Sequence, residues 1–341
     1  MHAIFVFLSK LSHQLRRENH HKIALAALSL LLIGGLCFSI TENVGLGESL
    51  WWSVVTMTTV GYGDISPVTA GGKVVGVVLM LTGIGFLGLF TATIASVFVE
   101  NKMLENKGMK PIDAQDHFVV CGWNSQGQKI VKELLADAKS NGLLVVILAQ
   151  LDEHPLAEEG VLFVRGEIDD EGMEKACLGQ ACTAILLADD AIDGGYRDAK
   201  MVMDVLNIKS SYPSVYVCAE LASSSTIDHV KKAGANEVIV AGELRSKLLV
   251  QAALDHGITE MVSELISNRY GQELYKFKAP QSLVGKQFFD ALCDLKKEKN
   301  VICLGLQKGA DDTVMTNPPS DLILEEGDSL LVVAEDRTSL I

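Results

Sequence analysis

The sequence predicts a membrane protein in two parts: a pair of apolar helices, followed by an α/β portion built on a parallel, doubly wound sheet. Two long uncharged apolar runs lie within the first 100 residues. From residue 117 onward, short apolar strands alternate with helical stretches, which is typical of a parallel sheet. After residue 270 the segments become shorter and richer in strands, so we expect a small α+β subdomain at the end of the chain.

The first apolar run covers residues 23–40 and the second covers residues 74–99. Both are long enough to cross the hydrocarbon core of a bilayer as helices. A secretory signal has a shorter apolar core that ends in a cleavage site of small residues, so we expect the first run to be retained. Residues 50–57, between the two runs, are apolar but too short to cross.

Basic residues flank the two runs on one side of the expected membrane. They are Lys10, Arg16, Arg17 and Lys22 before the first run, and Lys102, Lys107 and Lys110 after the second. The segment between the runs contains only Lys73. By the positive-inside rule, we expect a multi-pass protein of the cell membrane with both termini in the cytoplasm. The sequence has no arginine-rich span, which argues against a dedicated voltage sensor.

Charge and cysteine content restrict the function of the C-terminal portion. Residues 1–110 carry eight basic and six acidic side chains, whereas the remaining residues carry 21 and 37. Nucleic-acid binding requires clustered lysine and arginine, so we expect no nucleic-acid partner. The seven cysteines include no closely spaced Cys-x-x-Cys pair, which favours reduced thiols over a zinc site or a disulfide framework.

The following segments are predicted for the α/β portion. Strands are expected at residues 117–122, 143–148, 161–164, 184–187, 215–219, 237–240, 273–277, 301–307 and 329–334. Helices are expected at residues 126–139, 196–206, 226–233 and 243–267, the last broken near Gly257.

Residues 58–64 read Thr-Thr-Val-Gly-Tyr-Gly-Asp and lie between the two apolar runs. A potassium ion in a narrow pore must exchange its water for other oxygens, and backbone carbonyls from four chains around one axis can provide them. Glycines at 61 and 63 tolerate the dihedral angles that turn successive carbonyls the same way. The sequence therefore predicts a potassium filter, whose residues are Thr59, Val60, Gly61, Tyr62 and Gly63.

The short apolar segment before the filter, residues 48–57, can form a helix across half of the membrane. Its C-terminal end would point at the pore, where the helix dipole favours a cation. Residues 50–64 resemble the pore helix and filter of two-span potassium channels. The resemblance implies that Trp51 and Asp64 hydrogen-bond behind the filter, and that Trp52 braces the filter tyrosine. Val55 stands where some relatives have a buried glutamate, which implies altered filter inactivation.

The second apolar run is interrupted by glycines, which either allow close helix packing or form a hinge. Residues 82–86 resemble the hinge region of MthK-type channels, which implies a hinge at Gly83. Below it, apolar side chains could line a constriction, and an acidic residue either concentrates cations at the inner mouth or only caps the exit into water. These hinge and gate candidates are Gly83, Gly85, Phe90, Ile94 and Glu100.

Residues 119–127, Val-Val-Cys-Gly-Trp-Asn-Ser-Gln-Gly, follow a predicted strand and open a predicted helix. This is the place of the phosphate-binding loop in dinucleotide-binding folds, but Asn124 replaces the middle glycine. The second strand ends at Gln150, where such folds have an acidic residue for the ribose. The loop is therefore either a nucleotide site or a tight turn without a ligand. The nucleotide-binding candidates are Gly122, Asn124, Gly127 and Gln150.

The order of these parts, including the sequence His-Phe-Val-Val-Cys-Gly-Trp at residues 117–123, resembles MthK-type potassium channels with an RCK (regulator of potassium conductance) domain. The resemblance covers nearly the whole chain and implies five parts. They are a pore module at 1–100, a linker at 101–115, a Rossmann-like N-lobe at 116–242, a helical crossover and dimerisation segment at 243–270, and a C-terminal subdomain at 271–341.

The resemblance also implies a homotetrameric pore below a ring of eight RCK domains. The chain encodes one such domain, so four further soluble copies would be needed, for which internal starts near Met103 or Met109 are candidates. In calcium-gated relatives the ion ligands follow the fourth strand and lie in the next one. The first region contains Asp189 and Asp190, and the family's first aspartate is either displaced to Asp189 or replaced by Ala188. In the second region Glu220 matches one carboxylate, while Ala222 stands where a second would be.

Calcium usually takes six to eight oxygen ligands, so the loss of a carboxylate should weaken such a site. The gating ligand is left open between calcium, another ion, an adenine nucleotide such as NAD, ADP or ATP, and no ligand. We interpret the chain as a ligand-gated potassium-selective channel and not an enzyme. One alternative is a soluble regulatory subunit of a potassium transport system, against which the filter and both apolar runs argue. The other is a nicotinamide-dependent enzyme, for which the sequence offers no convergent His/Asp/Lys set.

Overall fold

The structure, a computed structural model, describes residues 20–190, 192, 194–309 and 313–336. The chain divides into two compact units, with the boundary after Met103. Lys10, Arg16 and Arg17, on which the expected membrane orientation partly depends, lie outside the described residues.

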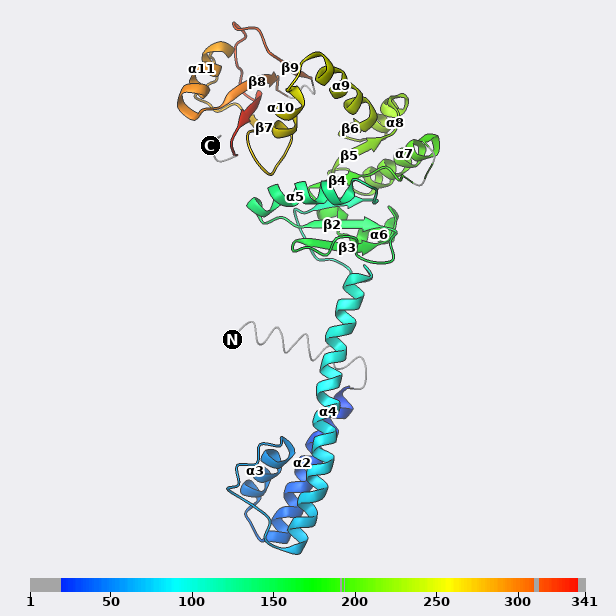
Figure 1. The fold of residues 1–341 in the computed structure, drawn as a ribbon, viewed down its shortest axis with the longest axis vertical. Helices are drawn as coiled ribbons and strands as arrows, with labels where there is room; N and C mark the ends of the chain where they lie inside the picture. Colours follow the sequence, from blue (N-terminus) through cyan, green and yellow to red (C-terminus); the bar gives the residue numbers. More distant parts are fainter. Residues whose placement is uncertain (1–19, 191, 193, 310–312, 337–341) are drawn as a thin grey trace. The chain divides into compact units, whose positions relative to one another are not determined.

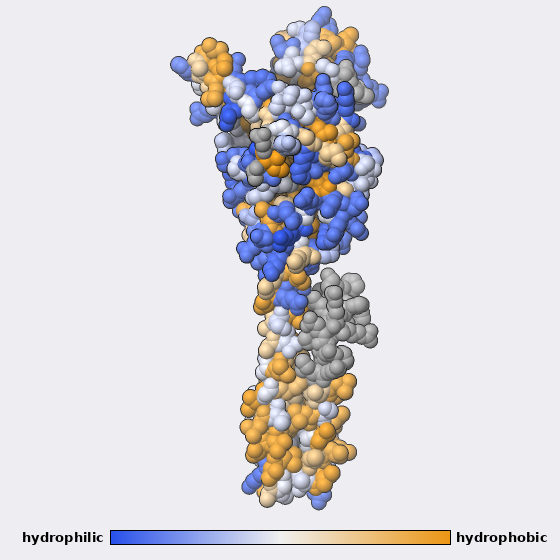
Figure 2. Space-filling view, turned by 90° about the vertical axis from the view of Figure 1, so that its right-hand side faces the viewer, coloured by the Kyte–Doolittle hydropathy of each residue, from blue (hydrophilic) through white to orange (hydrophobic). Residues whose placement is uncertain are grey.

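The N-terminal unit contains the helices α2 (His20–Glu42), α3 (Leu46–Met57) and α4 (Ala70–Asn106), as Figure 1 shows. Both α2 and α4 are long and apolar enough to cross a membrane, as the sequence predicts. Their outward-facing side chains are largely hydrophobic, and they form the orange surface of this unit in Figure 2. A surface of this kind is suited to contact with lipid.

A small core holds the N-terminal unit together. The rings of Phe38 from α2 and Trp52 from α3 are stacked with centroids 3.7 Å apart, and Leu79 from α4 completes the cluster. Side chains from all three helices therefore meet in one apolar cluster.

The C-terminal unit begins with a six-stranded parallel sheet in the order β3-β2-β1-β4-β5-β6. Its strands are β1 (Phe118–Cys121), β2 (Val145–Ala149), β3 (Val161–Arg165), β4 (Thr183–Leu186), β5 (Tyr216–Leu221) and β6 (Glu237–Val240). Two separate apolar clusters cover the two faces of the sheet. Strands buried on both faces read as continuous apolar runs rather than alternating ones, which is why the five residues of β2 are all buried. The predicted doubly wound sheet is confirmed.

Helices connect the parallel strands and cover the sheet. They are α5 (Gly127–Asn141), α6 (Asp170–Lys175), α7 (Gly194–Ser211) and α8 (Ile227–Lys232), with single turns of 3₁₀ helix at η1 (Leu178–Gln180) and η2 (Ser224–Thr226). The sequence did not predict α6, which is only six residues long and begins at the capping residue Asp169, whose carboxylate accepts a hydrogen bond from the Gly172 N–H.

The segment after the sheet is helical, with α9 (Ala241–Leu254) and α10 (Ile258–Leu265) separated at Gly257. Gly257 has a φ of +92°, a conformation that suits glycine, so the predicted break is observed. The chain then forms an antiparallel sheet in the order β7-β10-β8-β9. Its strands are β7 (Glu273–Lys278), β8 (Ile302–Gln307), β9 (Val314–Thr316) and β10 (Ser329–Ala334).

The antiparallel sheet is covered by α11 (Phe288–Lys299), which the sequence analysis did not predict. Its buried residues Phe288, Ala291 and Leu295 share one face of the helix and join the core of the subdomain. The rest of the helix is rich in charge, which weakens the apolar signal of the segment.

The segment after α4 lies against the parallel sheet and its adjoining turns. The Arg165 N–H at the end of β3 donates to the Gly108 carbonyl (2.9 Å), and the His154 N–H donates to the Asn106 carbonyl (2.8 Å). Further along, the Ile112 N–H donates to the Lys175 carbonyl. The first residues of the predicted linker therefore continue α4, and the following ones are hydrogen-bonded to the parallel sheet and its adjoining turns.

Candidate functional site

The filter segment, residues 58–64, follows α3 directly. Thr59, Gly61 and Gly63 have φ values of +60°, +56° and +76°, while Val60 and Tyr62 between them do not have positive φ. Alternation of left- and right-handed residues makes successive peptide groups face the same way. The backbone therefore has the conformation for which glycines at 61 and 63 were expected.

The α3 helix supports the filter segment through one side of its surface. The indole Nε1 of Trp51 donates a hydrogen bond to Asp64 Oδ2 at 3.0 Å, as the resemblance implied. The rings of Trp51 and Tyr62 are nearly parallel, with centroids 6.0 Å apart. A single tryptophan thus holds the end of the filter segment that contains Tyr62 and Asp64.

Trp52 and Trp51 have different surroundings within the subunit. Within the subunit Trp52 does not brace Tyr62: its ring is 4% exposed and stacks on Phe38, whereas Tyr62 is 68% exposed and lies against Trp51. Neighbouring residues on a helix point about 100° apart, so Trp51 and Trp52 cannot both face the filter segment. Val55, one of the buried residues of α3, leaves no carboxyl at its position.

The candidate hinge glycines differ in their surroundings. Gly83 is buried, and a Cβ added there would lie 3.0 Å from Met57 Cγ and 3.1 Å from Met57 Cα. Gly85 has nothing within 4 Å of the equivalent position. In this structure α4 is an uninterrupted helix through both residues. Gly83 therefore has a packing role, because its missing side chain lets α4 approach the end of α3.

The gate candidates Phe90, Ile94 and Glu100 all lie in the C-terminal half of α4. Phe90 stacks on Phe86 at 6.3 Å, and Ile94 follows one turn later on the same helix face. Glu100 is exposed near the end of the helix.

Sequence reasoning missed a contact at the start of α4. Glu42 Oε1, at the end of α2, accepts hydrogen bonds from the Val68 N–H, the Thr69 N–H and the Thr69 hydroxyl at 2.8–3.0 Å. A Cβ on Gly72 would collide with this carboxylate. The pairing of a lone acidic residue with a Thr-Ala-Gly-Gly sequence is the signal that could have identified this cap.

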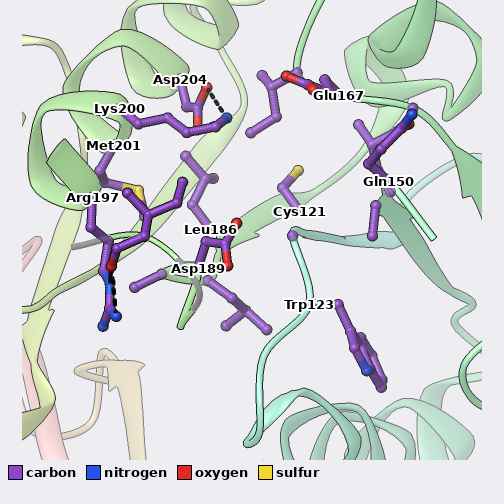
Figure 3. A pocket seen from close by; sticks show the side chains of 18 of the residues that line it. Cys121, Trp123, Gln150, Glu167, Leu186, Asp189, Arg197, Lys200, Met201 and Asp204 are labelled. Carbon is purple, nitrogen blue, oxygen red and sulfur yellow. Dashed lines mark hydrogen bonds and ion pairs between the residues drawn. The ribbon is translucent and has the colours of Figure 1, made fainter. Parts of the chain in front are cut away.

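A cavity of about 270 Å³ lies at the carboxyl ends of the central strands. The strand order reverses between β1 and β4, and this switch point is where open α/β sheets bind ligands. The lining comes from the ends of β1 to β4 and from one face of α7, which presents Arg197, Lys200, Met201 and Asp204. In Figure 3 these α7 side chains lie across the cavity from Gln150 and Glu167.

Only some of the predicted ligand-binding residues line this cavity. Gly122, Gln150 and Asp189 do, whereas Asn124, Gly127, Asp190 and Glu220 are not part of the lining. The α7 residues were not predicted because they are far from the loop in sequence and have no motif of their own.

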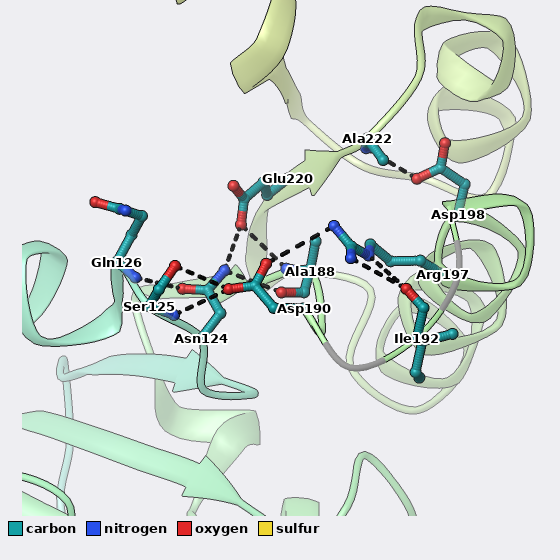
Figure 4. Close-up of polar contacts among 10 residues, drawn as sticks. All are labelled: Asn124, Ser125, Gln126, Ala188, Asp190, Ile192, Arg197, Asp198, Glu220 and Ala222. Carbon is teal, nitrogen blue, oxygen red and sulfur yellow. Dashed lines mark hydrogen bonds and ion pairs between the residues drawn. The ribbon is translucent and has the colours of Figure 1, made fainter.

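Asn124 and Glu220 take part in a polar network beside the cavity, drawn in Figure 4. The Asn124 Nδ2 group donates to Glu220 Oε2 at 3.0 Å and to the Ala188 carbonyl at 2.9 Å. The Ala188 N–H also donates to Glu220 Oε2, at 3.1 Å. The residue that replaces the middle glycine therefore ties the loop to the ends of β4 and β5, and the Glu220 carboxylate already has two donors.

Asp190 closes the other side of the same loop. Its Oδ2 accepts from the Ser125 N–H (3.1 Å) and the Ser125 hydroxyl (2.8 Å), and its Oδ1 lies 3.8 Å from Arg197 Nη1. The hydrogen bonds from the Ser125 backbone and hydroxyl, with a smaller effect of Arg197, lower the pKa of Asp190. Among the described residues, no group of three or more His, Cys, Asp or Glu side chains could hold a metal ion.

Both basic side chains of the cavity are engaged by other groups of the chain. Lys200 Nζ lies 3.1 Å from Asp204 Oδ2, and the Arg197 guanidinium donates to the Ile192 carbonyl at 3.0 and 3.2 Å. Burial raises the pKa of Asp204, which the Lys200 ammonium opposes. Burial also strongly raises the pKa of the Cys121 thiol in the cavity wall, so this cysteine stays protonated.

Comparisons with known proteins match three successive segments of the chain. Residues 25–100 match an ion-channel family model, residues 118–241 match the TrkA-N domain, and residues 242–340 match a family described as "Castor and Pollux, part of voltage-gated ion channel". The TrkA-N match covers all six strands of the parallel sheet.

Among curated proteins, the chain is 25% identical to the calcium-gated potassium channel TvoK of Thermoplasma volcanium, over 98% of this chain and 97% of that protein. It is 27% identical to the putative potassium channel protein YugO of Bacillus subtilis, over 92% of this chain and 95% of that one. Among solved structures, the gating ring of human SLO3 superposes with a TM-score of 0.51 at 15% identity, over 66% of this chain and 45% of that one, which shows a shared fold.

Proposed function

Because the chain is a membrane channel protein of the MthK type, in which an ion-channel module is followed by a TrkA-N (RCK) domain, we propose that it is a potassium-selective channel gated by a ligand of that domain. The observation that carries the proposal is the conformation of the filter segment. Its residues alternate in handedness between two membrane-length helices, and Trp51 holds its outer end through Asp64.

The proposed filter consists of residues 59–63, supported by Trp51 and Asp64. One subunit supplies one wall of a pore, and rings of backbone carbonyls need several chains around an axis, so we propose a homotetramer. Non-helical backbone at membrane depth is stable only where protein buries it or where it lines a wet cavity, and a pore axis meets this condition. Both termini would lie in the cytoplasm.

The proposed gate lies in the C-terminal half of α4. Phe90 and Ile94 would narrow the pore, Glu100 would face its inner mouth, and α4 would bend near Gly83 or Gly85. The absence of a Cβ contact at Gly85 leaves room for such a bend, whereas Gly83 is held against Met57.

For the ligand of the RCK domain we favour a small organic molecule such as an adenine nucleoside or nucleotide in the cavity. The cavity lies at the switch point of the sheet, and Gln150 and Gly122 are among its lining residues. Calcium is the second candidate because TvoK is described as calcium-gated. A calcium ion at Glu220 would have to compete with the Asn124 amide and the Ala188 N–H, and Ala222 offers no carboxylate.

Four additional soluble RCK copies, starting near Met103 or Met109, would complete a ring of eight domains. A denaturing gel of the natively expressed channel should then show a second, shorter band. A single band at the full length would exclude this part of the proposal.

Planar-bilayer recording of the purified, reconstituted chain tests the proposed function. We expect a current whose reversal potential follows the potassium gradient and whose open probability changes when adenine nucleotides or calcium are added on the RCK side. The variant Gly61→Ala places a Cβ where φ is +56° and should abolish potassium selectivity. Gly47→Ala, at an unobstructed position in α3, is the matched control and should conduct normally. Absence of potassium-selective current from the unmodified chain would refute the proposal.

A further inference from the structure

We propose that Asp190 determines which ligands the cavity accepts, because its carboxylate occupies the anion-binding position of the loop between β1 and α5 and excludes a ligand phosphate from it. This inference rests on the proposed ligand site in the RCK domain. It concerns the charge of the ligand, which the proposed function leaves open.

The donors that would hold a phosphate are already engaged. In dinucleotide-binding folds, backbone N–H groups of this loop and the first turn of the following helix bind the pyrophosphate. Here the Ser125 N–H and hydroxyl both donate to Asp190 Oδ2, and the Gln126 N–H donates to Asn124 Oδ1 at 3.0 Å. The position therefore contains a negative charge that belongs to the chain itself.

The surrounding charges do not favour a second anion. The acidic side chains of the lining are Glu167, Asp189 and Asp204, and its two basic side chains are Arg197 and Lys200. Both bases are engaged, Arg197 with the Ile192 carbonyl and Asp190, and Lys200 with Asp204. A phosphate entering the loop would have to displace Asp190 and then remain near its charge, which is unfavourable at distances of a few ångströms.

The rest of the cavity is free of this restriction. Gly122, Leu148, Gln150 and Ile168 line a region that combines apolar surface with an amide, and Asp190 does not line it. A nucleoside without phosphate can use this region and leave Asp190 on Ser125. The cavity is therefore expected to prefer adenosine over AMP and ADP, the reverse of the order expected for an open phosphate loop.

Binding of adenosine, AMP and ADP to the full-length channel in detergent tests this inference by isothermal titration calorimetry. For the unmodified chain we expect ADP to bind at least fivefold more weakly than adenosine. The variant Asp190→Asn removes the charge but retains an oxygen for Ser125. It should bind ADP at least tenfold more tightly than the unmodified chain does, with its adenosine affinity unchanged within twofold.

Asp321→Asn is the matched control, because Asp321 is exposed in the C-terminal subdomain and its replacement removes the same charge. It should behave like the unmodified chain with all three probes. Retained adenosine binding shows that Asp190→Asn is folded. ADP binding to Asp190→Asn that is no tighter than to the unmodified chain overturns the inference. Failure of all probes to bind also overturns it, while potassium-selective current in the bilayer would leave the proposed channel function intact.

Discussion

Trp51 concentrates the support of the filter segment in one side chain. It donates a hydrogen bond to Asp64, and its ring lies against Tyr62. Both contacts of the indole lie at the outer end of the filter segment, where Tyr62 and Asp64 are two residues apart. Loss of the hydrogen bond should therefore alter the behaviour of the filter rather than the fold of the subunit.

We predict that Trp51→Phe speeds the decay of potassium current at constant ligand. A hydrogen bond of this kind contributes about 1 kcal/mol, so the conducting filter should be disfavoured about fivefold. The measurement is the time course of current in reconstituted bilayers. Asp64→Asn keeps an acceptor for the indole and should show a smaller effect. Equal current decay in Trp51→Phe and the unmodified chain would contradict the assigned support.

Glu220 distinguishes the two candidate ligands of the RCK domain, because it would bind the ligand only if the ligand is calcium. In the structure its carboxylate accepts from the Asn124 amide and the Ala188 N–H, so it has a structural role without any ion. We predict that Glu220→Gln lowers the stability of the channel by about 1–2 kcal/mol in the absence of calcium, because both donors then face an amide instead of a carboxylate. Thermal unfolding in EDTA measures this loss. A variant that is fully stable in EDTA, but no longer stabilised by calcium, would instead establish Glu220 as a calcium ligand.

His117 should make the C-terminal unit sensitive to acid. Its side chain is fully buried, Nε2 lies 3.0 Å from the Ala176 carbonyl, and Nδ1 has no hydrogen-bond partner among the residues that the structure describes. Burial lowers the pKa of His117 below the usual value of 6.5. The unfolded chain therefore binds a proton at a higher pH than the folded chain does. The stability that the folded unit gains from keeping His117 neutral is fully present above about pH 6.5. It is lost as the pH falls towards the pKa of His117 in the folded chain, by at most about 1.4 kcal/mol per pH unit.

Melting temperatures at pH 7.5 and 5.5 test this prediction. The unmodified chain should lose more stability between the two values than His117→Gln, which cannot be protonated. His256→Gln, at an exposed histidine, should resemble the unmodified chain. If His117→Gln loses as much stability as the unmodified chain, His117 is not the source of the pH dependence.

At the scale of elements, the contact between α3 and α4 decides between two interpretations of Gly83. The sequence left open whether the glycine allows packing or forms a hinge. The structure shows a packing role, because a Cβ would lie 3.0 Å from Met57 Cγ. A packing role and a hinge role can coexist, but a substitution of Gly83 would lower stability in the first case and alter gating in the second.

We predict that Gly83→Ala destabilises the channel by about 1–3 kcal/mol, the usual cost of overpacking, because α4 must move away from Met57. Gly85→Ala, two residues away and without neighbours, should be neutral or slightly stabilising. Thermal stability in detergent and open probability in bilayers are measured together. A Gly83→Ala channel with unchanged stability and altered gating would favour the hinge alone.

The elements themselves were predictable to different degrees, for physical reasons. The central strands β1 and β2 are apolar and buried on both faces, and this gives a strong sequence signal. The helix α6 is too short for a periodic pattern, and β9 has three exposed residues, so neither has such a signal.

In the cavity, Gly122, Gln150 and Asp189 could be found from strand ends, whereas the α7 residues depend on how that helix crosses the sheet. The role of Asn124 could not be seen, because its partners are 64 and 96 residues away.

At the scale of the whole molecule, gating requires that the ligand bind the open state more tightly than the closed one. We infer that the connection between α4 and the RCK domain transmits the effect of the ligand to the pore, because the segment after α4 is hydrogen-bonded to that domain within a few residues of the helix end. We predict that three glycines inserted after Lys107 leave ligand affinity within about threefold but reduce the ligand-dependent change in open probability at least fivefold. Calorimetry and bilayer recording measure the two quantities.

The same insertion after Gly142, in an unobstructed turn between α5 and β2, serves as the control and should leave gating unchanged. Normal gating after the insertion at Lys107 would show that the segment does not transmit the signal.

The docked segment also bears on where a soluble RCK copy could begin. β3 is an edge strand of the parallel sheet, and the Gly108 carbonyl accepts from its Arg165 N–H. A copy that started at Met109 would lack this carbonyl and that of Asn106, so it would expose the end of an edge strand to pairing with other chains. A copy that started at Met103 would retain both acceptors. The protection of this edge from aggregation therefore favours Met103 as the first residue of any soluble form, and the intact mass of that form would identify it.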